Sequence, residues 1–302
     1  MIEHLKSIKN AIMYYFQTLI NKKIYRYYLR LQILDDECTI NEIIENKKSI
    51  SRFGDGEFLW ILDEKDTPSF QENNYELAQK LKEVILSRED NLLICIPKNL
   101  QKIKNERFFD KWFWRRFVNI YGEKLKPYLK ESTIYGNTNV SRFYMGYRNK
   151  KKTDKKIKDL RNIWQSKDIV IVEGEYTKLG VGNDLFNNAQ KIERIICPPQ
   201  NAFDYYEIIL GETKKVSKEK LIIISLGPTA TILAYDLSKA GYQALDLGHI
   251  DIEYEWYLKK AKNKISVNGK FVNEAKDHLK KQDSTMTEED YKYKKSIIAV
   301  IK

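Results

Sequence analysis

Asp55 and Glu57 are two carboxylates that stand two residues apart, with Gly54 and Gly56 beside them in the segment 52–57. In an extended segment, side chains at positions i and i+2 leave the same face of the backbone, so both carboxylates would point to one place. The glycines would let a ligand approach the main chain closely. Hard oxygen ligands of this kind suit Mn²⁺ or Mg²⁺, which often binds substrate phosphates as well. The segment therefore predicts a metal site, and the alternative is a tight turn with solvated acids.

Short apolar runs, separated by helical patterns, organise the rest of the chain. Helices are predicted over 41–46, 75–87 and from Thr229 through Leu237. Near-continuous runs of Val, Ile and Leu between helices are typical of parallel strands buried on both faces. The prediction is an α/β fold, Rossmann-like, with a mostly parallel sheet and helices on both faces. The expected strands are 50–53, 92–96, 169–172, 195–197, 221–226, 244–247 and 296–301.

The strand predicted at 221–226 is followed by Gly227, Pro228 and Thr229. In an open parallel sheet, ligands bind beyond the carboxyl ends of the strands. Thr229 is a suitable N-cap, and the free amides and dipole of a helix start suit a phosphate. These three residues are therefore expected to contact a nucleotide, although an ordinary strand-to-helix turn has the same pattern.

Polar residues also follow the strand predicted at 169–172. Gly180 and Gly182, placed before an expected helix, suggest a phosphate cradle, but their spacing is neither a Walker A nor a Gly-x-Gly-x-x-Gly motif. Ordinary ATP or dinucleotide binding is therefore disfavoured. Sugar or nucleotide contacts are expected from Glu173, Thr177, Asn183 and Asp184, the last two having helix capping as an alternative role.

The strand predicted at 244–247 leads into His249, Asp251 and Glu253. The two acids alternate with isoleucines, so in an extended segment they would share one face. A lone histidine is most often structural, but at a strand end beside two acids it is placed for a general base or a third metal ligand. These three residues are the catalytic candidates.

Four ordered stretches resemble one known family. Residues 49–58 are similar to the signature opening of the glycosyltransferases with the GT-D fold, a bacterial group once catalogued as a domain of unknown function. Residues 172–186, 195–203 and 225–256 match later parts of the same pattern. The resemblance implies that the Asp-x-Glu pair, here Asp55 and Glu57, holds a metal on the diphosphate of a nucleotide sugar.

The same resemblance implies transfer of a sugar from a nucleotide-sugar donor, expected to be UDP-linked, to an acceptor hydroxyl. The acceptor would be a glycan, a glycopeptide or a lipid-linked molecule of bacterial glycan or glycoprotein assembly. Arg52 would place a positive fork near the phosphates, with Gly54 beside it. The residues alone indicate only metal-assisted chemistry on a phosphorylated ligand. A metal-dependent phosphohydrolase or nuclease is therefore an alternative.

The formal net charge of +11 reflects 53 basic and 42 acidic residues. Segment 98–116 interleaves lysines and arginines with Phe and Trp, which could hold phosphates and stack bases. A nucleic-acid-binding protein is thus a further alternative, although no specific nucleic acid is expected. Anionic lipid and diphosphate substrates suit the same charge.

The expected organisation is an amphipathic helical segment at 1–38, a catalytic domain at 39–258 and a polar helical appendage at 259–302 with a possible final strand. The first helix could dock on the protein body, on a second subunit as a homo-oligomer, or on a membrane. Three scattered cysteines argue against a disulfide framework, and neither a secretory signal nor an apolar run of ~20 residues is evident. A cytoplasmic protein, peripheral at the inner membrane face, is expected.

Overall fold

The structure, a computed structural model, describes residues 22–63, 71–101, 105–272 and 288–302. Within them, a single nine-stranded sheet has the order β1-β4-β3-β2-β8-β7-β5-β6-β9, and every paired strand runs parallel to its neighbour. The strands are β1 (Gln32–Ile33), β2 (Ser49–Arg52), β3 (Leu92–Ile96), β4 (Ile134–Asn137), β5 (Asp168–Gly174), β6 (Lys191–Cys197), β7 (Leu221–Ser225), β8 (Ala244–Asp246) and β9 (Ile297–Val300).

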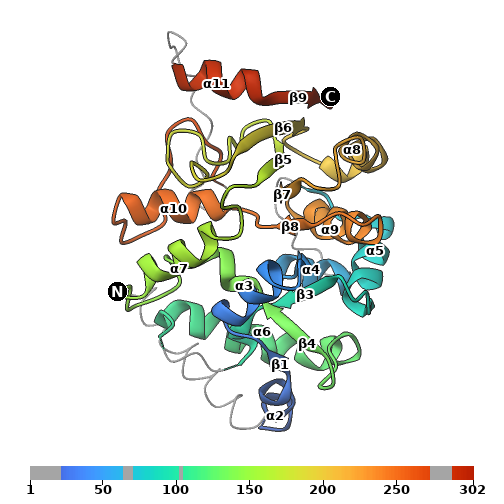
Figure 1. Ribbon diagram of the computed structural model, residues 1–302. Helices are drawn as coiled ribbons and strands as arrows, with labels where there is room; N and C mark the ends of the chain where they lie inside the picture. Colours follow the sequence, from blue (N-terminus) through green and yellow to red (C-terminus); the bar gives the residue numbers. More distant parts are fainter. Residues whose placement is uncertain (1–21, 64–70, 102–104, 273–287) are drawn as a thin grey trace.

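Helices cover both faces of this sheet. Figure 1 shows α3, α7 and α10 on one side of the strands and α5, α8 and α9 on the other. Residues alternate accordingly along each strand, so that Ile171 of β5 packs into one hydrophobic cluster and Val172 into the other. The α-helices are α2 (Lys22–Arg30), α3 (Asp36–Ile44), α4 (Asp55–Ile61), α5 (Tyr75–Leu86), α6 (Phe108–Leu125), α7 (Thr153–Arg161), α8 (Tyr206–Thr213), α9 (Pro228–Lys239), α10 (Ile250–Leu258) and α11 (Glu288–Ser296).

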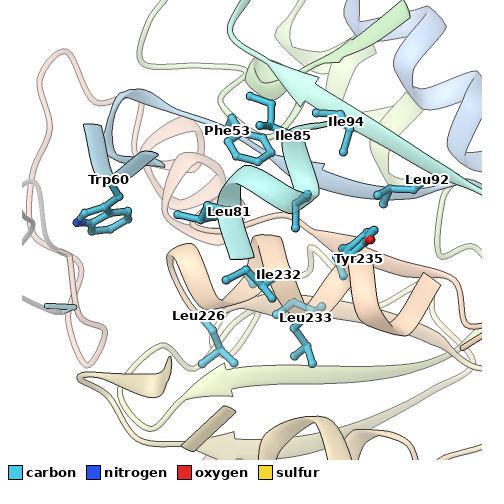
Figure 2. Packing of buried hydrophobic residues seen from close by; sticks show 14 of the residues in the cluster. Phe53, Trp60, Leu81, Ile85, Leu92, Ile94, Leu226, Ile232, Leu233 and Tyr235 are labelled. Carbon is cyan, nitrogen blue, oxygen red and sulfur yellow. The ribbon is translucent and has the colours of Figure 1, made fainter. Parts of the chain in front are cut away.

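Helix α5 illustrates how the sequence produces this packing. Asn74 caps the helix by accepting a hydrogen bond from the Leu77 amide at 2.8 Å. The apolar residues at three- and four-residue spacing then face inward. Figure 2 shows Leu81 of α5 between Phe53 at the end of β2 and Ile232 of α9. The strand that precedes Asp55 and the helix that follows Gly227 are therefore joined through one core.

The predicted α/β fold with a mostly parallel sheet is confirmed. All seven expected strands are present, but β1 and β4 were missed, because β1 has only two residues and β4 combines Ile134 and Tyr135 with Gly136 and Asn137. A short run that ends in glycine and asparagine has the composition of a turn. Both missed strands lie at one edge of the sheet.

The segment after α10 differs from the polar helical appendage expected there. Residues 261–272 contain no helix, and Val267 and Val272 are buried in the second cluster. Lys270 is buried too, so this part of the chain belongs to the protein body. The expected helix over residues 1–20 lies outside the described residues, and the proposed domain boundaries stay predictions. None of the described helices has the length and apolar character to cross a membrane.

Candidate active site

A cavity of about 910 Å³ lies at the carboxyl ends of seven parallel strands. Its walls also include the first turns of α6 and part of the irregular segment 263–271. This is the edge of a parallel sheet where ligands bind in α/β proteins. The strand ends contribute Arg52 and residues 54–57 (β2), Pro97 and Asn99 (β3), Thr138 and Asn139 (β4), Gly174 and Thr177 (β5), Pro198 and Pro199 (β6), Ser225, Leu226 and Gly227 (β7), and Asp246, Gly248 and His249 (β8).

The centre of this cavity is the junction of β2 and β8. From β2 the chain continues to β3 on one side, whereas from β8 it continues through α10 to β9 at the opposite edge. Neighbouring strands whose connections diverge leave a crevice between them, and this switch point is the usual ligand site of such sheets. Asp55 and Glu57 follow β2, and His249 follows β8, so the strongest sequence candidates do meet here.

The geometry expected for Asp55 and Glu57 is wrong, because they do not lie on an extended segment. Both belong to the first turn of α4, where residues two apart point about 200° from one another around the helix axis. The Gly54 amide donates a hydrogen bond of 2.8 Å to Glu57 Oε2, so that Glu57 caps its own helix. Both acids nevertheless line the cavity.

Their electrostatic environments differ. Burial, reinforced by the charges of Asp246 and Asp55, raises the pKa of Glu57 to about 7. The Asp55 side chain is exposed to the cavity, whose walls still remove enough solvent to raise its pKa. Arg142 and Lys264 act in the opposite direction on Asp55. Two acids therefore face a cavity that is also lined by cationic side chains, as a site for a metal and a phosphorylated ligand requires.

Arg52 is less available to a ligand than expected. Its Nη2 lies 2.9 Å from Asp246 Oδ1, its Nε donates to the Asp246 carbonyl at 2.6 Å, and its Nη1 donates to Ser141 Oγ at 2.8 Å. The guanidinium thus ties β2 to β8 at the floor of the cavity. Gly248 makes room for it, since a Cβ there would lie 2.2 Å from Arg52 Nη2 and the backbone φ is +50°. Arg52 therefore serves mainly to connect β2 with β8, and this set of contacts is called the Arg52 clamp.

The turn after β7 matches the expectation in part. Gly227 lines the cavity and has φ +55°, so glycine suits this turn, and it occupies the N-cap of α9. Pro228 takes the first helical position. Thr229 is therefore not the N-cap, and its buried hydroxyl has no hydrogen-bond partner among the described residues. The start of α9 opens on the cavity through Gly227, while Pro228 and Thr229 are not among the described residues that line it.

The acids after β8 do not share a face, because α10 begins at Ile250 and makes them helical. Asp251 is buried and paired with Lys270 Nζ at 2.5 Å. Glu253 accepts hydrogen bonds from the Tyr144 and Met145 amides at 2.9 and 2.8 Å. Glu253 and His249 line the cavity, whereas Asp251 does not. A catalytic role for Asp251 is not supported by this position.

The polar residues after β5 are mostly structural as well. The buried Glu173 pairs with Arg194 at 2.5 Å and accepts from the Leu179 amide at 2.6 Å. Asn183 donates to Asp251 and Glu255, and Asp184 accepts from Tyr254 and Arg161. No helix starts at Gly180 or Gly182. Of the four expected contacts here, only Thr177 lines the cavity.

Several cavity residues were not among the predicted site residues. Arg107, Arg142 and Lys264 supply positive charge, and Glu106 adds a nearly buried carboxylate. Arg142 follows the missed strand β4, so recognition of that strand would have drawn attention to it. Lys264 lies in a lysine-rich stretch that gives no signal of its own.

Comparisons with known proteins identify the family to which this fold belongs. A family model described as glycosyltransferase GT-D fold matches residues 50–275. The glycosyltransferase GlyD of Streptococcus pneumoniae serotype 4 is 37% identical over 277 residues, which are 90% of this chain and 33% of that protein. The chain spans about a third of the length of the curated relatives it matches.

Two solved structures share the fold over nearly the whole chain. A structure reported as a domain of unknown function with a distinct glycosyltransferase fold has a TM-score of 0.84 at 35% identity, and covers 92% of this chain and 98% of its own. A structure reported as a new glycosyltransferase from Streptococcus sanguinis has a TM-score of 0.82 at 32% identity, and covers 90% of this chain and 100% of its own. The structural similarity therefore covers nearly all of the chain, including most of the sheet.

Proposed function

Because the chain belongs to the family of glycosyltransferases with the GT-D fold, we propose that it transfers a sugar from a nucleotide-diphosphate sugar to an acceptor hydroxyl. The donor is expected to be a UDP-sugar. The acceptor would be a glycan, a glycopeptide or a lipid-linked molecule in bacterial glycan or glycoprotein assembly. The observation that carries the proposal is the cavity at the β2–β8 switch point, where acids, cations and a glycine-led helix start face one space.

The residues present fit a divalent cation. Asp55 and Glu57 line the cavity, and Glu57 is disfavoured as an anion partly by the neighbouring charges of Asp55 and Asp246. Among the described residues, no three His, Cys, Asp or Glu side chains converge as a complete ligand set. Mg²⁺ is commonly held by one or two carboxylates together with substrate phosphates and water, so Asp55 and Glu57 would suffice. When bound there, the ion would supply charge neutralisation for the departing nucleoside diphosphate.

The chain's own groups would do the remaining work. Arg142 and Lys264 are placed to offset diphosphate charge, and the start of α9 at Gly227 offers amide groups to a phosphate. Arg52 keeps β2 and β8 in register beneath the donor. His249, at the end of β8, would take the proton of the acceptor hydroxyl if the anomeric configuration inverts.

The proposal is tested by measuring nucleotide release from UDP-, GDP- and dTDP-sugars with Mn²⁺, with Mg²⁺ and with excess EDTA. We expect release from one nucleotide class, loss of activity in EDTA and recovery on adding metal. Full activity in EDTA would reject the metal, and no release from any donor would reject the sugar transfer.

The alternatives are less well supported. A metal-dependent phosphohydrolase or nuclease commonly uses a denser set of acids and histidines than the described residues bring together. For nucleic-acid binding, the aromatic residues of segment 98–116 would need an open basic groove. Phe109, Trp112 and Phe113 instead line the cavity described above, together with the acids Glu106 and Asp110.

A further inference from the structure

The cavity has a second side, away from the β2–β8 junction at which the donor is proposed to bind. It is built by the ends of β3 and β4 and by the first turns of α6. A cavity of about 910 Å³ is near the upper end of the ~300–1,000 Å³ usual for small-molecule sites. There is therefore space beside the donor for part of a second ligand.

Polar groups on this second side are joined in a relay. Asn139 Nδ2 donates a hydrogen bond to Asn99 Oδ1, and Asn99 Nδ2 donates to Glu106 Oε1. All three residues line the cavity, and Glu106 is only 4% exposed. Carboxylate and amide groups fixed in this way can accept from and donate to the hydroxyl groups of a bound sugar.

Aromatic side chains of α6 stand next to the relay. Phe109, Trp112 and Phe113 line the cavity, and Phe109 remains 68% exposed. The exposed ring of Phe109 offers an apolar face to the cavity, and the C–H faces of a pyranose are apolar enough to pack on it. An anionic membrane surface would be less suitable, because Glu106 and Asp110 lie on the same side.

On these grounds we infer that the β3–β4–α6 side of the cavity is an acceptor subsite for a hexopyranoside, with Glu106 contacting its hydroxyls and Phe109 packing on its ring. The inference rests on the proposed function, since it assigns the second substrate of that same reaction. A sugar bound there would present a hydroxyl toward the donor bound at the β2–β8 junction.

The chain offers a matched pair of residues for the test. Phe108 and Phe109 are adjacent, and their exposed fractions are 66% and 68%, but Phe108 does not line the cavity. Binding of a panel of p-nitrophenyl hexopyranosides (gluco, galacto and N-acetylated) would be measured directly, with and without UDP. We expect Phe109→Ala to weaken binding of the preferred glycoside ~10-fold, which is near the upper end of what one aromatic contact contributes. Phe108→Ala should bind as wild type.

Glu106→Gln is the second variant, since it keeps the shape and the bond from Asn99 while removing the charge. It should weaken glycoside binding, whereas Phe108→Ala should leave both glycoside binding and the rate of donor hydrolysis without acceptor unchanged. Equal effects of Phe108→Ala and Phe109→Ala, or no binding of any glycoside by wild type, would overturn the inference. Loss of co-sedimentation with anionic vesicles in both Phe variants, with glycoside binding intact, would assign the rim to a membrane instead. Glycoside binding without nucleotide release from any donor would reject the proposed function and leave the subsite standing.

Discussion

Two acid-rich corners of the sheet differ in what faces their carboxylates. At the β2–α4 corner, Asp55 and Glu57 line the cavity, and their ionisation is disfavoured by burial. At the β5–α10 corner, Glu173 and Asp251 are buried against Arg194 and Lys270 and do not line this cavity. Acids paired with a cation from the same chain are held in the local structure, whereas acids left facing a cavity are available to a metal or substrate.

The largest effect is expected from breaking the buried pair. Lys270→Met would leave Asp251 without its cation in a site where both side chains are at most 5% exposed. Removing one partner of such a pair costs ~3–5 kcal/mol of unfolding free energy. Chemical denaturation would measure this loss, and activity per folded molecule should be unchanged. An Asp251→Leu/Lys270→Met double variant should recover much of the stability, and failure to do so would show that the pair is not the cause.

Asp55→Asn should instead lower activity while leaving stability nearly unchanged. Its side chain is exposed to the cavity and pairs with no described cation at ion-pair distance, so the melting temperature should change little. Sugar transfer should fall ~10²–10³-fold, as for the loss of one group that stabilises transition-state charge. Glu57→Gln should lower sugar transfer by a similar factor, because Gln preserves the helix cap while removing the charge. Steady-state kinetics beside a thermal melt would separate the two effects, and a variant that melted early with normal kcat would place Asp55 among the structural acids.

Gly248→Ala tests the clamp that joins the two halves of the cavity floor. A methyl group there would collide with Arg52 and would require a positive φ at a non-glycine residue, at a cost of ~1–3 kcal/mol. We expect a lower melting temperature together with a higher KM for the donor, since Arg52 holds β2 against β8. Gly211→Ala is a control, because nothing lies within 4 Å of the Cβ it would add.

The smallest effect concerns pH. A carboxyl group whose pKa is higher in the folded protein than its ordinary value destabilises the fold as it ionises. For Glu57 this loss should run from its ordinary pKa of 4.5 up to about 7. Between pH 5 and about pH 8, the melting temperature of wild type should therefore fall more than that of Glu57→Gln. The comparison with this variant is needed because burial also raises the pKa of Glu106 to about 7, and Glu106 is present in both proteins. Mn²⁺ with UDP should restore stability mainly above pH 7. Parallel curves for the two proteins would contradict the shift.

Much of the site could be predicted from local pattern. The strands β2, β3, β5, β7 and β8 were found from their apolar runs, and the rule that ligands bind at carboxyl ends placed Asp55, Glu57, Gly227 and His249 at one cavity. The resemblance to the GT-D family was carried by ordered motifs in the chain and is confirmed by the family match.

The errors have a common cause, which is that adjacency in sequence does not determine direction in space. Asp251 and Glu253 were placed on one face because an alternating pattern was taken for a strand, but α10 sends one toward Lys270 and the other toward the Tyr144 amide. Arg142 was missed because its neighbours in sequence carry no motif, and Glu106 because only the basic and aromatic residues of segment 98–116 drew attention.

The sequence by itself determined the parallel α/β sheet, the family and the pair of acids after β2, because apolar periodicity and short motifs are local properties of the chain. Only the tertiary structure decided which acids are paired with a cation. Arg194 meets Glu173, Arg52 meets Asp246, and Lys270 meets Asp251 through contacts between different elements. Burial and ion pairing depend on what the fold brings within a few ångströms, so the division between structural and ligand-facing carboxylates could be made only in three dimensions.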